Sequence, residues 1–131
     1  MGLDMDLYGE KFYWTNWNDP SKNLLEDGFR IQSKVLSLGY WRKHPDLHGF
    51  IVKTFANGKD ECQRIDLTGE DLIKIIEAVK SNTLPHTEGF FFGSSETADE
   101  QNTIEQLEKD LAWIMVREEG ISRQVYYEAS W

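Results

Sequence analysis

Two histidines, His44 and His48, lie four residues apart, a spacing at which two imidazoles on one helix can share a metal ion. Pro45 lies between them. Because a residue that precedes proline is pushed toward extended backbone, His44 is not expected to lie one helical turn before His48. The HExxH pattern is also absent. We therefore predict no metal site here and interpret the two histidines as surface or capping residues.

Cys62 is the only cysteine, and it is a candidate nucleophile only if the fold brings a base beside it. His48 and His86 are bases that could serve, which makes Cys62 and His48 the candidate catalytic residues. The simpler interpretation is that Cys62 is a small apolar side chain packed in the core, and we favour it. A lone cysteine also excludes an internal disulfide and is typical of a reducing compartment.

Gly93, Ser94 and Ser95 follow a short aromatic run and precede an expected helix. Backbone amides at a helix start, together with two hydroxyl groups, could bind an anion such as phosphate. The lysine and the glycine spacing of a nucleotide-binding loop are missing. A strand-to-helix connection capped by serine explains the same residues, so both interpretations stay open.

Aromatic residues make up 13% of the chain, and core packing should account for most of them. An exposed subset could form a ligand cleft or a partner interface, where Trp, Tyr and Arg contribute most of the binding energy. The segment of Tyr40, Trp41, Arg42 and Lys43 is the best candidate, because it ends an expected strand and combines aromatic surface with charge. If it binds a partner, replacing Trp41 and Arg42 with alanine should abolish binding and leave the fold intact.

The chain has 23 acidic residues against 14 Lys and Arg, a net charge of −9. Such a charge repels nucleic acids, and the one compact basic cluster, around Arg42 and Lys43, is too small to reverse this. Six of the nine excess charges lie between Glu96 and Glu119. This segment is interpreted as a solvated helix face, or alternatively as a surface that docks a basic partner.

Apolar periodicity predicts five strands and three helices, and hence a single α+β domain over residues 1–131 with a mainly antiparallel sheet and helices on one face. The expected strands are 3–14, 29–41, 63–67, 89–93 and 123–131. One helix should begin at Pro45 and end near Asn57 and Gly58, and a second should begin after Thr68 as its N-cap. The acidic segment should form the third helix, with Gly120 as its C-terminal stop.

With 131 residues the chain is long enough for one domain with a real core and too short for two. No apolar run approaches the roughly 20 residues of a membrane span. The first residues lack the basic and apolar regions of a signal peptide. We therefore expect a soluble protein located in the cytoplasm.

Several stretches together resemble a family of small phage-encoded proteins that begin MGLDMYL and end YYxSSW. They are Met1–Met5, Tyr40–Lys43 followed by His48, Asp60–Cys62, Leu84-Pro85 before Gly89–Ser94, Asn102–Glu105, Tyr126-Tyr127 and Ser130-Trp131. They cover nearly the whole chain in the same order. The chain departs from the family at Asp6, at His44-Pro45 and at Ala129.

The resemblance implies a phage protein in the host cytoplasm, with no established role for His48 or Cys62. Some members are labelled phosphoglycerate kinase, but that activity needs two large domains and a nucleotide site, which 131 residues without a phosphate loop do not provide.

We expect a non-enzymatic accessory protein, without a cofactor, that binds a host protein or a small molecule. The alternative is a small hydrolase or nucleotide-processing enzyme that uses Cys62 with His48, or the turn at Gly93, Ser94 and Ser95. A third possibility is a homodimer in which the strand from Val125 to Trp131 pairs across a two-fold axis.

Overall fold

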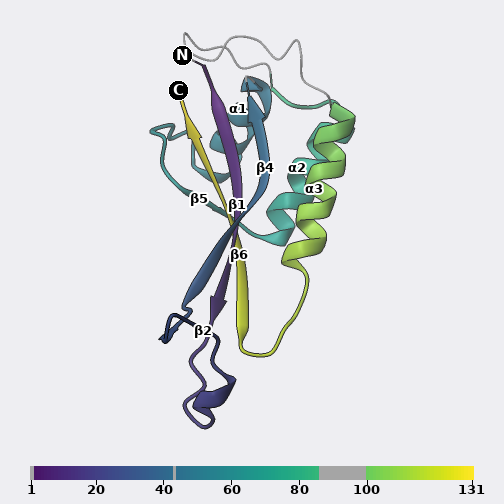
Figure 1. The fold of residues 1–131 in the computed structure, drawn as a ribbon. Coiled ribbons are helices and arrows are strands. Elements are labelled where there is room, and N and C mark those ends of the chain that lie inside the picture. The colour runs from purple at the N-terminus through teal and green to yellow at the C-terminus, as the bar shows by residue number, and fades with distance from the viewer. Residues whose placement is uncertain (1, 43, 86–99) are drawn as a thin grey trace.

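The computed structural model describes residues 2–42, 44–85 and 100–131 (Figure 1). These residues form a single α+β domain. Its helices are α1 (Pro45–Phe55), α2 (Gly69–Lys80) and α3 (Glu100–Ile114), with a short 3-10 helix η1 (Pro20–Lys22). Its strands are β1 (Asp4–Tyr13), β2 (Leu25–Glu26), β3 (Phe29–Arg30), β4 (Ser33–Arg42), β5 (Ile65–Leu67) and β6 (Ile121–Ser130).

The main sheet has four antiparallel strands in the order β4-β1-β6-β5, and β2 and β3 form a separate hairpin. This confirms the predicted α+β class and its mainly antiparallel sheet. Because β6 lies between β1 and β5, Val125 to Tyr127 are paired on both sides. The middle of that strand therefore has no free edge for the expected pairing of residues 125–131 across a two-fold axis.

Alternation along the central strands separates an inner from an outer face of the sheet. Met5 and Leu7 of β1 and Leu3 just before it are fully or almost fully buried, and Val125 and Tyr127 of β6 join them in the core. The three helices pack on this inner face, and Figure 1 shows them alongside one half of the sheet only. The intervening side chains point to the other face, as strand geometry requires.

The two helix starts that the sequence predicted are confirmed. Pro45 is the first residue of α1, and the N-cap residue His44 accepts the Leu47 amide proton through Nδ1, with 3.4 Å between the two nitrogens. Thr68 caps α2 in a reciprocal capping box with Asp71, at N···O distances of 2.9 and 3.1 Å.

Gly120 is not the end of the third helix, contrary to the prediction. α3 ends at Ile114, and the Trp113 carbonyl near its end accepts a hydrogen bond from the Arg123 guanidinium at 2.9 Å. Gly120 has φ +77° and instead forms the turn that enters β6. Of the expected strands, 89–93 lies outside the described residues.

The single strand expected over 29–41 is two strands, β3 and β4. The first pairs with β2 across a turn whose residues, Asp27 and Gly28, both have positive φ, as a two-residue hairpin demands. β4 also contains a bulge at Leu38, where the register with β1 shifts. The bulge places Val35 opposite Glu10, so Val35 lies on the outer face, away from the side of Trp41 that its parity predicted, and is 51% exposed.

Candidate functional site

His48 is the centre of a buried polar chain at the helical end of the molecule. Its ring is 2% exposed, its Nδ1 lies 2.6 Å from the Tyr127 hydroxyl, and its Nε2 lies 3.0 Å from both carboxylate oxygens of Asp60. α1 supplies the histidine, β6 the tyrosine, and the loop before β5 the aspartate. The interpretation of His48 as a surface or capping residue is therefore wrong.

The three side chains form a hydrogen-bonded structural link in which His48 and Tyr127 are buried and Asp60 is 27% exposed. Burial raises the pKa of Tyr127 well above its ordinary value, and the charges of Asp60 and Asp6 add to the effect. The tyrosine hydroxyl therefore stays protonated and donates a hydrogen bond to His48 Nδ1. The ring proton of His48 is then on Nε2, which donates a hydrogen bond to Asp60. Tyr127 is 1% exposed, so a substrate has no access to its hydroxyl.

His44 faces away from this chain, although it lies only one turn earlier. Its Nδ1 is used in the helix cap, and its Nε2 lies 2.9 Å from a carboxylate oxygen of Glu100. The capping interpretation of His44 is confirmed. The described residues contain no group of three or more His, Cys, Asp or Glu side chains arranged to hold a metal ion.

Cys62 is exposed, which contradicts the prediction of a small buried side chain. It has φ +58°, in the loop that carries Asp60, and this loop turns back toward β5. The two ring nitrogens of His48, its candidate base, face Tyr127 and Asp60. The other candidate base, His86, lies outside the described residues, as does the candidate anion turn of Gly93, Ser94 and Ser95.

The candidate binding segment from Tyr40 to Lys43 is divided between the two faces of the sheet. Tyr40 donates a hydrogen bond to Asp4 on the outer face, where Arg42 also lies 3.9 Å from Asp4. Trp41 points to the helices and donates to the Thr103 hydroxyl of α3 at 3.1 Å. Lys43 lies outside the described residues. Replacing Trp41 would therefore disturb helix packing, so the double alanine variant does not test binding alone.

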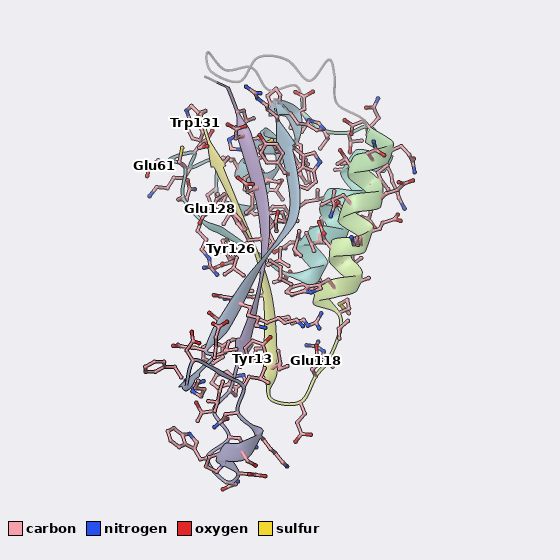
Figure 2. The ribbon with its side chains drawn as sticks, viewed as in Figure 1. Tyr13, Glu61, Glu118, Tyr126, Glu128 and Trp131 are labelled. Atoms are coloured by element: carbon pink, nitrogen blue, oxygen red, sulfur yellow. The ribbon has the colours of Figure 1, made fainter. Side chains whose placement is uncertain are left out.

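The outer face of the sheet is acidic and partly aromatic. Tyr8 and Tyr126 stack with ring centroids 5.2 Å apart, and the Arg64 guanidinium lies 3.8 Å from the centre of the Tyr126 ring. Figure 2 shows Tyr126 and Glu128 on this side, away from the helices. Burial, and then the charge of Asp4, raise the pKa of Asp6.

The exposed apolar side chains gather at the opposite end, in residues 14–36, which we call the arm. The arm holds seven of the eleven large apolar side chains that are exposed in the described part of the chain. They are Trp14, Trp17, Leu24, Leu25, Phe29, Val35 and Leu36. Figure 1 shows that the arm extends beyond the helices, which lie along the other half of the sheet.

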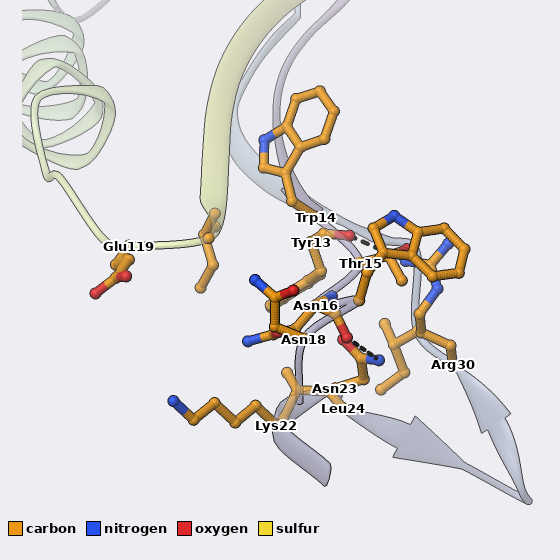
Figure 3. Close-up of a pocket in the computed structure, with 14 residues that line it drawn as sticks. Tyr13, Trp14, Thr15, Asn16, Asn18, Lys22, Asn23, Leu24, Arg30 and Glu119 are labelled. Atoms are coloured by element: carbon orange, nitrogen blue, oxygen red, sulfur yellow. Dashed lines mark hydrogen bonds between the residues drawn. The ribbon is translucent and has the colours of Figure 1, made fainter. Parts of the chain in front are cut away.

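A cleft with a volume of about 680 Å³ opens at the base of the arm. Figure 3 shows Trp14, Lys22 and Arg30 around it, and Trp17, which is 86% exposed, also lines it. Tyr13 and Asn18 complete much of its wall. Two indole rings beside an amide and two cationic groups form an amphipathic surface suited to binding.

Hydrogen bonds hold the arm in place without a core of its own. The Asn16 amide donates to Asn23 Oδ1 at 2.7 Å, and the Asp19 amide donates to Asn16 Oδ1 at 2.9 Å. The Arg30 guanidinium donates to the Tyr13 carbonyl at 3.0 Å, which ties the hairpin to the end of β1. The exposed rings are therefore carried on a defined backbone.

The sequence predicted no helix or strand between the expected strands 3–14 and 29–41, and the arm was therefore missed. The signal was present: Trp17, Leu24, Leu25 and Phe29 are large apolar residues around an Asp-Gly turn, in a stretch too short to bury them.

Comparisons of the whole chain with protein-family models, with characterised proteins and with solved structures find no match. In the part of the chain that the structure describes, no helix has the length and apolar character needed to cross a membrane.

Proposed function

We propose that this chain is a non-enzymatic accessory protein of the phage type that acts by docking a protein chain onto its arm. The observation that supports this proposal is the concentration of exposed apolar side chains on the arm. Trp17 and Phe29 are 86% and 77% exposed, although a monomer gains nothing from holding such rings in water. Exposed apolar clusters of this kind mark protein interaction sites.

The chemistry of the described residues supports binding over catalysis. The side chains of His48, Asp60 and Tyr127 hydrogen-bond to one another, and the hydroxyl of the buried tyrosine is closed to substrate. An enzyme that uses Cys62 would need a base beside this exposed thiol, whereas both ring nitrogens of His48 face other groups. Docking of a protein on the arm requires no reactive side chain, because apolar contact and complementary shape are sufficient.

A capture experiment tests the proposed function. Tagged wild-type protein, the variant Leu25→Ser/Phe29→Ser and the control variant Ile73→Ser are recovered from cells that also produce the untagged chain. Ile73 is an exposed apolar residue of α2, away from the arm. We expect wild type and Ile73→Ser to retain the same protein chains and the arm variant to lose them. Equal retention by all three proteins would contradict the proposal.

The cleft supports a second candidate function, the binding of a small molecule. Its volume of about 680 Å³ lies within the range of small-molecule sites, and the indole rings of Trp14 and Trp17 offer stacking surface. Native mass spectrometry of purified protein separates the two functions. A stoichiometric small-molecule adduct, lost in Trp17→Ala, would favour the ligand, whereas a bare sequence mass would favour protein docking.

A further inference from the structure

The charges of the arm differ from those of the remaining chain. Residues 14–36 contain three acidic side chains, Asp19, Glu26 and Asp27, and three basic ones, Lys22, Arg30 and Lys34. The arm therefore has no net charge, and the whole excess of nine negative charges lies outside it. If the arm served only to keep the protein in solution by charge repulsion, it would carry the same negative charge as the rest of the chain.

The charged groups of the arm have few partners in the described chain, where Asp19 accepts hydrogen bonds from the Ser21 backbone amide and hydroxyl. Among the described residues, none of these six side chains forms an ion pair with another residue of the chain, whereas elsewhere Arg64 pairs with Asp66 and Lys80 with Glu108. Arg30 donates to a backbone carbonyl. Equal numbers of unpaired acids and bases, placed around exposed rings, make a surface that is complementary to a copy of itself.

The apolar surface of the arm is large enough for a stable contact. The three aromatic side chains Trp14, Trp17 and Phe29 are about three-quarters exposed on average, which corresponds to roughly 450 Å² at about 200 Å² for each ring system. A standard interface buries about 800 Å² on each partner. The rings alone supply more than half of that area, and Leu24, Leu25 and Val35 add to it.

We propose that the occupant of the arm is a second copy of this chain, docked arm to arm about a two-fold axis. The shape of the molecule favours this arrangement. In Figure 1 the arm lies at one end, and the helices with both termini lie at the other. Joining two arms therefore places the two acidic bodies at opposite ends of the dimer, where salt screens most of their repulsion.

The arrangement also accounts for the β2–β3 hairpin. A two-stranded hairpin that stands alone is marginally stable in water and gains from packing against a further element. In the described chain Leu25 and Phe29 remain 63% and 77% exposed, so the chain itself does not supply that packing. The hairpin of a second copy supplies apolar side chains of the same kind. The inference rests on the proposed function, since both take the arm as the docking surface.

Sedimentation velocity of the purified chain tests the proposal. We expect wild type to dimerise, and Phe29→Ser to weaken the dimer about a hundredfold, because two-fold symmetry removes two exposed rings at once. Leu25→Ser should also weaken it, and Ile73→Ser should leave it unchanged. All three positions are exposed in the monomer, so the far-UV circular dichroism should be the same for every variant.

Charge variants test whether the surface is complementary to itself. Glu26→Lys gives each arm a net charge of +2 and Lys34→Glu a net charge of −2. Each variant alone should dimerise about tenfold more weakly than wild type, since two altered side chains lie in every dimer. An equal mixture of the two variants should recover wild-type affinity as a mixed dimer.

Two results would overturn the self-docking proposal. One is a wild-type chain that stays monomeric at concentrations up to about 1 mM. The other is a dimer that Phe29→Ser leaves intact, or that Ile73→Ser weakens equally. Capture of a different protein through the arm, together with a monomeric chain in sedimentation, would uphold the proposed function and refute the self-docking. Loss of arm dependence in both experiments would refute both.

Discussion

Asp110 of α3 is a buried carboxyl group that should make this protein more stable when the group is protonated. It is 1% exposed, one carboxylate oxygen accepts the Gln106 side-chain amide at 2.9 Å, and no group in the described residues donates to the other oxygen. Burial is the main cause that raises its pKa from 3.8 to about 7, and Gln106 and Lys109 oppose the shift only partly. Asp110→Asn removes the charge and keeps the shape and the acceptor.

The magnitude follows from the difference between the folded and unfolded pKa values. Because the folded value lies higher, the folded state binds the proton more tightly, and stability falls as the pH rises from about 4 to about 7. The rise of the Asp110 pKa from 3.8 to about 7 corresponds to a change of about 4 kcal/mol in the free energy of unfolding. We therefore expect Asp110→Asn to match wild type near pH 4 and to exceed its free energy of unfolding by about 4 kcal/mol near pH 8.

Urea denaturation of both proteins at several pH values between about 4 and 8 measures this difference. Glu108→Gln is the matched control, because Glu108 lies on the same helix but is exposed and pairs with Lys80 at 2.8 Å. Its effect should stay below about 1 kcal/mol at every pH. A difference between Asp110→Asn and wild type that does not change with pH would refute the reasoning.

Three further outcomes follow from single contacts. Tyr127→Phe should lower the free energy of unfolding by about 1–3 kcal/mol in urea denaturation, because it leaves the buried His48 Nδ1 without its 2.6 Å donor; an unchanged value would show that the link adds no stability. Gly9→Ala should cost about 1–3 kcal/mol in the same assay, since its new Cβ would lie 2.7 Å from the Trp113 ring, and a neutral result would mean that the ring moves freely. Cys62 should react with a thiol reagent in the folded protein as fast as in urea, and protection until unfolding would contradict its exposure.

The parts of the fold that the sequence predicts are those controlled by local chemistry. Proline at the start of α1 and the Thr68–Asp71 capping box are contacts between residues at most a few positions apart, so the sequence shows them directly. The inward side chains of β6 follow from alternation in the same way. The end of α3 was missed because a distant residue, Arg123, bonds the Trp113 carbonyl there.

The contacts of His48 and the exposed arm were harder to predict, because both depend on which elements cover which surface. Spacing gave no sign that His48 would meet Asp60 and Tyr127, which lie 12 and 79 positions away. The helices decide the exposure of Trp41 and Tyr40. They cover the face of β4 that carries Trp41 and leave the face that carries Tyr40 in water. The arm was missed because the exposure of its apolar side chains depends on which layers the fold places over them, and spacing along the chain does not show this.

The two ends of the sheet meet opposite physical requirements. Under the helices polar groups must be paired, and His48 is linked on both sides in consequence. On the arm, roughly 450 Å² of aromatic surface stays in water, and burying it would contribute about 11 kcal/mol per copy at 25 cal/mol/Å². Only part of this free energy would appear as affinity, because association costs roughly 4–15 kcal/mol and the ordering of interface side chains adds to that cost. The buried end contributes stability, and the exposed end leaves in water the apolar surface on which the proposed docking rests.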